Sequence, residues 1–130
     1  MEAKVIADSD FLVDLLRGSK GAVSLAEQML REGVEVLSTS ISVFELWLGA
    51  LRLGRKGETK KLLDDIDILP LDREASLSSA EILHNLQKRG RAIDYRDLFV
   101  AGIARSRDIS TIVSRDESFT RMDGLRIKTF

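Results

Sequence analysis

Residues 4–18, KVIADSDFLVDLLRG, join a short apolar run to an amphipathic run through the acidic turn Asp8-Ser9-Asp10. The run from Lys4 to Ala7 predicts a buried strand, and Phe11 to Arg17 predicts a helix that ends at Gly18. A strand that passes directly into a helix is the unit of a parallel sheet with helices on its faces. An acid at this junction is expected as a helix cap, so Asp8 points to a function only if it does more than cap the helix.

The same alternation of strand and helix continues to the end of the chain. Further strands are expected over residues 34–37, 68–71, 111–114 and 125–129. Helices are expected from Ser19 to Arg31, from residues 39–42 to Leu53, from Lys60 to Ile66, from Asp72 to Gly90, from Asp94 to Arg107, and as a turn from Glu117 to Met122. This order predicts an α/β fold, a three-layer α/β/α arrangement with a mainly parallel central sheet, in a single domain over residues 1–130.

Composition narrows the chemistry. The 130 residues include no cysteine and one histidine, His84, which excludes disulfides, cysteine-based zinc sites and histidine-rich metal sites. No run approaches the ~20 apolar residues of a membrane span, and the start lacks a signal-peptide pattern, so we expect a cytoplasmic protein. A net charge of −1 argues against a protein that simply coats nucleic acid, but not against a nuclease whose clustered acids offset its bases.

Four acidic residues lie in or beside apolar elements: Asp8, Glu45, Asp97 and Asp116. Carboxylates rarely occupy such places unless they are paired or bind a metal. Parallel sheets place their ligand crevice at the carboxyl ends of the strands, where Asp8 and Asp116 are expected. Oxygen ligands of this kind suit Mg²⁺ or Mn²⁺, so the pattern predicts a metal site formed by all four, and metal-assisted hydrolysis of a phosphodiester.

Each acid also has a purely structural interpretation. Asp8 and Asp116 are each placed to cap the helical segment that follows, and Asp94 and Asp97 have the spacing of a capping box. Glu45 lies well past any cap, although a surface position between two apolar faces would accommodate it. Asp97 shares the apolar stripe of its helix, which favours an inward direction.

Four stretches carry a resemblance to a known family: residues 6–18, 41–46, 93–104 and 114–119. They resemble the acidic motifs of PIN-domain ribonucleases, and the length and ending are similar to those of VapC-type toxins of toxin–antitoxin pairs. The resemblance implies an Mg²⁺- or Mn²⁺-dependent endoribonuclease that acts on RNA, forms a homodimer and is held inactive by a cognate antitoxin protein. It also implies catalytic roles for Asp8, Glu45, Asp97 and Asp116.

Residues beside these acids are assigned supporting roles. Ser9 and Ser114 are expected to orient water or a carboxylate, Ser114 as part of the catalytic set, and Arg115 is expected to contact phosphate. Asp10 occupies a position that is more often Asn or Ser in the family pattern, and its role is left open. Ser118 stands where that pattern often has an acid, which favours one metal over two.

Other functions remain open at this stage. The form Asp8-Ser9-Asp10 also occurs in haloacid dehalogenase-type phosphatases, but residues 114–119 lack their later acidic motif. A receiver domain needs an acid at the end of a central strand, where this chain has Leu37-Ser38. A non-catalytic RNA- or protein-binding module would use the acids as caps alone. Phe44, Trp47, Leu48 and Leu51 are interpreted as core or, alternatively, as an apolar groove for a partner.

Overall fold

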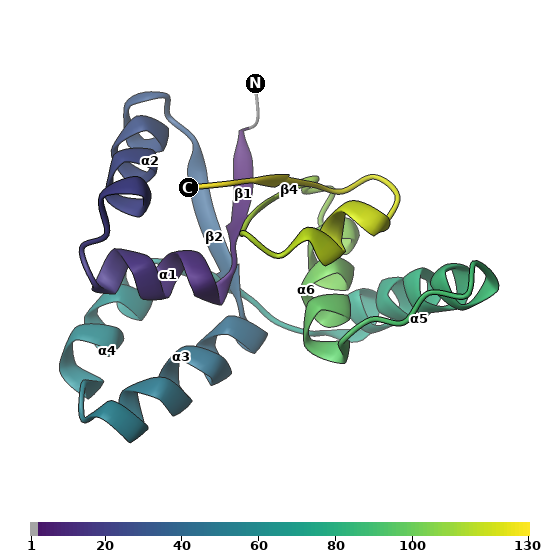
Figure 1. Ribbon diagram of the computed structural model, residues 1–130, viewed down its shortest axis with the longest axis horizontal. Coiled ribbons are helices and arrows are strands. Elements are labelled where there is room, and N and C mark those ends of the chain that lie inside the picture. Colours follow the sequence, from purple (N-terminus) through teal and green to yellow (C-terminus); the bar gives the residue numbers. More distant parts are fainter. Residues whose placement is uncertain (1–2) are drawn as a thin grey trace.

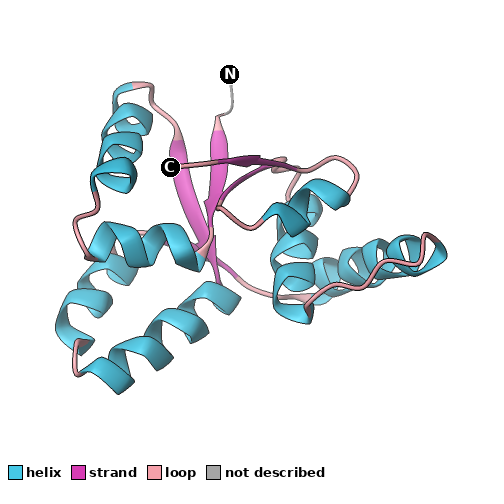
Figure 2. Cartoon of the chain, viewed as in Figure 1, coloured by secondary structure: helices cyan, strands magenta, loops and turns pink. Residues whose placement is uncertain are grey.

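The computed structural model describes residues 3–130, in which strands and helices alternate along the chain (Figures 1 and 2). The strands are β1 Lys4–Ala7, β2 Glu35–Thr39, β3 Asp67–Leu69, β4 Thr111–Val113 and β5 Arg126–Lys128. The helices are α1 Ser9–Leu16, α2 Lys20–Arg31, α3 Ser40–Leu53, α4 Lys56–Asp64, α5 Arg73–Lys88, α6 Tyr95–Ser106 and the 3₁₀ helix η1 Glu117–Arg121. None of these helices has the length and apolar character needed to cross a membrane.

The five strands form one sheet in the order β3-β2-β1-β4-β5, and every neighbouring pair is parallel. The chain starts at the centre with β1, adds β2 and β3 on one side, and then crosses over to β4 and β5. The crevice that forms where the strand order reverses therefore falls between β1 and β4, whose following connections run to opposite faces of the sheet. The prediction of a parallel α/β/α arrangement is confirmed.

Side chains of β1 alternate between the two faces of the sheet and show why three layers form. Val5 and Ala7 pack in the core with α1, α2 and α3, whereas Ile6 packs in the second core with α5, α6 and η1. All three are fully buried. In Figure 1 helices α1 to α4 lie on one side of the sheet and α5 and α6 on the other. A central strand buried on both faces needs the continuous apolar run that residues 5–7 supply.

One local expectation from the sequence is wrong. Helix α4 begins at Lys56 rather than Lys60 and includes Gly57 in its first turn, because a single glycine costs a helix only about 1 kcal/mol relative to alanine and does not break it. Gly54 alone ends the preceding helix, with a left-handed φ of 68°.

The apolar residues around Glu45 are not core. Phe44 is 62% exposed and Leu51 53% exposed, and Trp47 is only half-buried. Helix α3 instead buries its other side through Leu46 and Ala50. The interpretation of Phe44, Trp47 and Leu51 as core is therefore incorrect. Helix α3 lies at the margin of its layer and packs mainly against α1 and α4.

Helices α5 and α6 pack tightly enough that one position tolerates only glycine. A Cβ at Gly102 would lie 1.8 Å from Ser79 Oγ, 2.7 Å from the carbonyl oxygen of Ala75 and 2.9 Å from Ser79 Cβ. The hydroxyl can rotate away, but the backbone oxygen cannot.

We therefore expect Gly102→Ala to lower the free energy of unfolding by about 1–3 kcal/mol through overpacking. Gly49→Ala is the matched control, since a Cβ there meets nothing within 4 Å and alanine favours the helix by up to about 1 kcal/mol. Urea denaturation of both variants measures the difference. Equal stability of the two variants would show that α5 and α6 can separate at no cost.

Candidate active site

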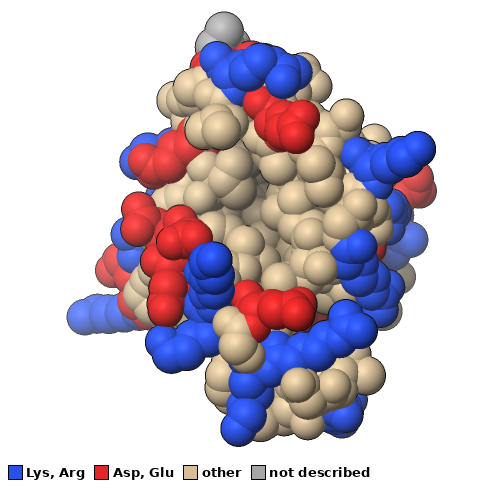
Figure 3. Space-filling model, turned by 90° about the vertical axis from the view of Figure 1, so that its left-hand side faces the viewer, with Lys and Arg blue, Asp and Glu red and all other residues tan. Residues whose placement is uncertain are grey.

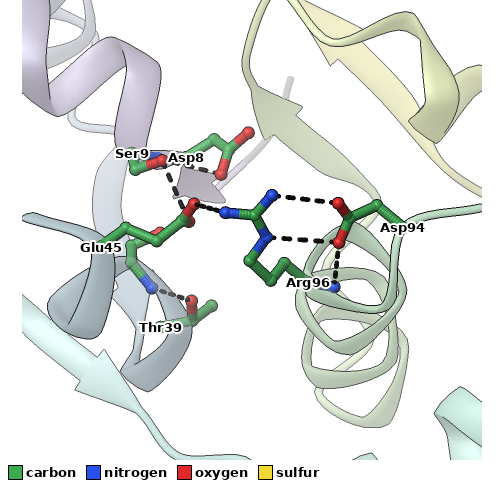
Figure 4. Close-up of polar contacts among 7 residues, drawn as sticks. Asp8, Ser9, Thr39, Glu45, Asp94 and Arg96 are labelled. Carbon is green, nitrogen blue, oxygen red and sulfur yellow. Dashed lines mark hydrogen bonds and ion pairs between the residues drawn. The ribbon is translucent and has the colours of Figure 1, made fainter.

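A cavity of about 250 Å³ opens at the carboxyl ends of β1 and β4, between α3 and α6. Eight residues line it: Asp8, Ser9, Asp10, Glu45, Asp94, Arg96, Asp97 and Asp116. Six of these are acidic, and all four acids singled out in the sequence are among them. Part of the arrangement is seen in Figure 4, where Glu45 from α3 and Arg96 from α6 face each other beside Asp8. The fold therefore gathers acids that are far apart in the sequence.

Asp8 is both a helix cap and a cavity residue. It follows β1, and its Oδ1 accepts a hydrogen bond of 2.9 Å from the N–H of Ser9 at the start of α1. Its Oδ2 accepts a hydrogen bond of 2.9 Å from the buried Ser114 hydroxyl. The residue is only 7% exposed. Asp8 therefore caps α1 and lines the cavity at the same time, because its two oxygens have different partners.

Ser114 connects the ends of the two central strands. Besides Asp8, its oxygen accepts a hydrogen bond of 3.0 Å from the N–H of Asp116. Asp10 completes the connection, since its Oδ2 accepts from the N–H of Arg115 at 2.9 Å. Asp10 therefore fastens the turn after β4 to the start of α1, which gives a structural role to a residue whose function the sequence left open.

Glu45 reaches the cavity from α3 and is held loosely. Its Oε1 accepts a hydrogen bond of 3.2 Å from the Ser9 hydroxyl, and its Oε2 lies 3.4 Å from Arg96 Nη1 (Figure 4). Thr39 fixes the start of this helix, because its Oγ1 accepts from the N–H of Ser42. Ser9 thus orients a carboxylate, as expected, and that carboxylate is Glu45.

Asp97 and Asp116 both line the cavity, and each shifts the pKa of the other. Asp97 is half-buried on α6 and accepts a hydrogen bond of 3.2 Å from the Ser118 hydroxyl. Asp116 caps η1, where its Oδ1 accepts from the N–H of Ser118 at 2.9 Å. Helix α6 is capped by Asp94, whose Oδ1 accepts from the N–H of Arg96. The contacts of Asp97 are therefore those of a cavity residue rather than of a capping box.

Burial and mutual repulsion make the cavity costly to ionise. Burial, followed by the hydrogen bond and charge of Asp116, raises the pKa of Asp97 to about 7. Burial also raises the pKa of Asp8 to about 6, with the nearby charges of Asp10 and Glu45 adding to the effect. Burial alone would raise the pKa of Asp116. The hydrogen bond from the Ser118 N–H and the interaction with the Asp97 carboxyl outweigh it and hold the pKa of Asp116 below its usual range.

A divalent cation would fit this site, because a positive ion among the carboxylate oxygens would reduce the repulsion between them. As the side chains stand, no three acidic, histidine or cysteine side chains within residues 3–130 form a ready set of ligands. Glu45 is turned toward Ser9 and Arg96, and Asp97 and Asp116 each accept a hydrogen bond from Ser118. The donor chemistry is suitable, and loading would require some of these contacts to open.

The cationic residue at the cavity is Arg96, which the sequence analysis missed. The expected phosphate contact, Arg115, is instead engaged elsewhere: its Nη2 lies 2.7 Å from Asp14 Oδ2, and its guanidinium stacks on the Phe130 ring at 4.1 Å. The signal for Arg96 was its place directly before Asp97 in the first turn of α6, which puts both side chains beside the same cavity.

Comparison of the sequence with known protein families shows where the chain belongs. The family model described as the PIN domain matches residues 5–125, which includes every residue of the cavity. The chain belongs to the PIN domain family. The resemblance found in the four acidic stretches is thereby confirmed at the level of the family.

Named relatives and a solved structure agree with this membership. Ribonuclease VapC5 of Mycobacterium tuberculosis is 27% identical over 95 residues, which cover 68% of this chain and 70% of the relative. The tRNA(fMet)-specific endonuclease VapC of Shigella flexneri is 29% identical, with 75% and 76% covered. The crystal structure of VapBC2 from Rickettsia felis, bound to a promoter DNA fragment, superposes with a TM-score of 0.85 at 17% identity, covering 97% and 98%. At that identity the structural likeness shows the fold.

The raised pKa values make a prediction about the metal-free PIN domain. In EDTA, the folded state holds the protons of Asp97 and Asp8 more tightly than the unfolded chain, whose carboxyls have a pKa near 3.8. Their stabilising contribution is complete below that value and is lost as pH rises through 6 and 7. We expect Asp97→Asn, which cannot ionise, to gain stability relative to the parent between about pH 4 and pH 8, by about 1 kcal/mol because solvent screens a half-buried group.

Thermal melting in EDTA across this pH range gives the difference between variant and parent. Asp123→Asn is the control, since Asp123 is 82% exposed and far from crowding, and its difference should stay flat. A melting temperature of Asp97→Asn that falls below the parent's at every pH would show that Asp97 stabilises the fold as a cap rather than repelling its neighbours.

Proposed function

We propose that this PIN domain is a metal-dependent endoribonuclease that cleaves phosphodiester bonds in RNA. The observation that carries the proposal is the cavity in which Asp8, Glu45, Asp97 and Asp116 meet at the carboxyl ends of the central strands. The relatives named ribonuclease and endonuclease support the same reaction class. Hydrolysis of an RNA phosphodiester is the chemistry that a carboxylate cluster of this kind serves.

We further propose Mg²⁺ or Mn²⁺ as the ion, held by Asp8, Asp97, Asp116 and Glu45. When bound it supplies charge neutralisation at the phosphate and acidifies a water for in-line attack. The chain's own residues prepare the ligands: Ser114 keeps Asp8 oriented and favours its ionised form, and the Ser9 hydroxyl orients one oxygen of Glu45. The Ser118 hydroxyl positions Asp97.

Substitution of the two strand-end acids tests the chemistry. Asp8→Asn and Asp116→Asn should each lower RNA cleavage by at least about 100-fold, because a neutral amide is a poor ligand for a hard cation. Both residues are helix caps, and Asn caps as well as Asp, so the circular dichroism spectrum should stay that of the parent.

EDTA should abolish cleavage by the parent protein, and added Mn²⁺ or Mg²⁺ should restore it. Titration of Mn²⁺ should also raise the melting temperature of the parent, and much less that of Asp97→Asn. Cleavage that persists in EDTA, or in both variants, would rule out this mechanism. Binding of RNA without cleavage under any metal condition would favour the non-catalytic module instead.

We also propose that a cognate antitoxin protein covers this site, as the likeness to VapC-type proteins and to the VapBC2 assembly suggests. An apolar cavity of about 90 Å³ lies between α1, α3 and α4 and reaches Glu45. Its apolar lining includes Val13, Leu16, Leu46 and Leu53. Figure 3 shows the side formed by α1 to α4, where uncharged surface is hollowed between charged side chains; a second apolar cavity, lined by residues of α1, α2 and α4, also lies on this side. A homodimer remains part of the proposal.

Leu53→Asp tests this seat for a partner, because Leu53 is 69% exposed and lies in the cavity wall. When the chain is co-expressed with its cognate antitoxin, we expect the variant to lower the affinity of the complex by at least about tenfold. Cleavage by the isolated variant should equal that of the parent. Leu77→Asp is the control, since Leu77 is 51% exposed on α5 and should leave the complex intact. An affinity of Leu53→Asp equal to that of the parent would place the partner elsewhere.

A further inference from the structure

One positive side chain lies among the acids of the cavity. Of its eight lining residues, Arg96 alone is cationic, and its guanidinium lies between Glu45 on α3 and Asp94 at the start of α6 (Figure 4). The two carboxylates hold it differently, and this difference carries the inference.

Asp94 holds Arg96 firmly. The carboxylate of Asp94 accepts from two nitrogens of the guanidinium, Nε at 3.3 Å and Nη2 at 3.0 Å, and from the backbone N–H of Arg96 at 2.8 Å. A cap and a two-point contact therefore share one carboxylate. Such a fork fixes the plane of the guanidinium and reduces the conformational entropy lost when it binds a ligand.

Glu45 holds Arg96 weakly. The contact is a single one of 3.4 Å between Nη1 and Oε2, and the Arg96 side chain is 60% exposed. Long, solvent-exposed ion pairs contribute little to stability, so this pair opens at small cost. The Nη1 group, once free, presents its hydrogens to the cavity while Asp94 still keeps the guanidinium in place.

We propose that Arg96 is the substrate-positioning residue of this PIN domain, paired with Glu45 in the resting protein and transferred to a phosphate of the RNA when Glu45 engages a divalent cation. The inference rests on the proposed ribonuclease function. Arginine suits this task because its planar donors match two phosphate oxygens. Arg115 does not compete for it, since Asp14 and Phe130 occupy that guanidinium.

If Arg96 exchanges Glu45 for a phosphate, its removal should change cation binding and RNA binding in opposite directions. Removal of the Arg96 charge leaves the acids with more negative potential, so a cation binds more tightly. The same removal deprives the RNA of a contact, so the substrate binds more weakly. A residue that only supported the fold would weaken both.

The experiment compares the parent with Arg96→Gln, Arg96→Lys and the control Arg105→Gln. Arg105 lies in the last turn of the same helix, outside the acidic cavity, and is exposed. Calorimetric titration of Mn²⁺ into RNA-free protein should give a Kd for Arg96→Gln about threefold to fivefold below the parent's. The KM for a single-stranded RNA should rise about tenfold, with kcat changed less than threefold.

Salt dependence identifies the lost contact as one to phosphate. The slope of log KM against log salt should fall by about 0.7 in Arg96→Gln, which corresponds to one phosphate contact on a single strand. Arg96→Lys should retain the parent's Kd for Mn²⁺ and recover only part of the KM, because lysine keeps the charge but lacks the fork. Arg105→Gln should match the parent in every measurement.

The outcomes separate this inference from the function on which it rests. If the parent binds Mn²⁺ and cleaves RNA while Arg96→Gln weakens both properties, or changes neither, the positioning role is overturned and the ribonuclease function stands. A parent that neither binds Mn²⁺ nor cleaves RNA overturns both. A fall in kcat with no change in KM also overturns the role, since Arg96 would then act on the reaction rather than on substrate placement.

Discussion

Repulsion among carboxylates at one end of the sheet is the constraint on which the rest of this structure depends. Asp8, Asp97 and Asp116 line a single cavity with Glu45, and burial raises the pKa of Asp8 and Asp97. The surrounding chain answers with hydrogen-bond donors. Hydroxyls from Ser9, Ser114 and Ser118, two backbone N–H groups and one guanidinium contact these acids. These contacts fix the positions of the carboxylates and offset part of the cost of burying them.

Helix capping and the lining of the cavity use the same carboxylates here. Asp8 and Asp116 each accept the N–H at a helix start with one oxygen, and both residues also line the cavity. This economy follows from parallel topology: strands end where helices begin, so a cap at that junction also faces the crevice. Asp94 extends the pattern, since its cap fixes an arginine rather than a metal ligand. An acid at such a junction can therefore cap a helix and line the cavity at the same time.

Much of this was predictable from the sequence, for identifiable reasons. The apolar run before Asp8 and the glycine after α1 set the strand–helix unit, and parallel pairing then brings Asp8 and Asp116 together with no further information. Arg96 was not predictable in the same way, because its direction depends on a bidentate contact with Asp94 that forms only once α6 has begun. The interpretation of Trp47 as core was wrong for a related reason. Helical spacing shows which residues share a face, but the position of α3 at the edge of its layer decides whether that face is covered.

The two halves of the cavity differ in how closely their side chains are held, and this difference would suit the proposed binding of both an ion and RNA. On the β1–β4 side, Ser114 ties Asp8 to Asp116 and Asp10 ties the following turn to α1, all with contacts of 2.9–3.0 Å. On the α3–α6 side, Glu45 has contacts of 3.2 and 3.4 Å with partners that are partly exposed. In the proposed mechanism, the strand ends would hold their acids in place, while the contacts between α3 and α6 could rearrange when an ion and RNA bind. Specific placement of a long flexible substrate needs that adjustable half, because every phosphate of the RNA carries the same charge and only geometry distinguishes the one to be cut.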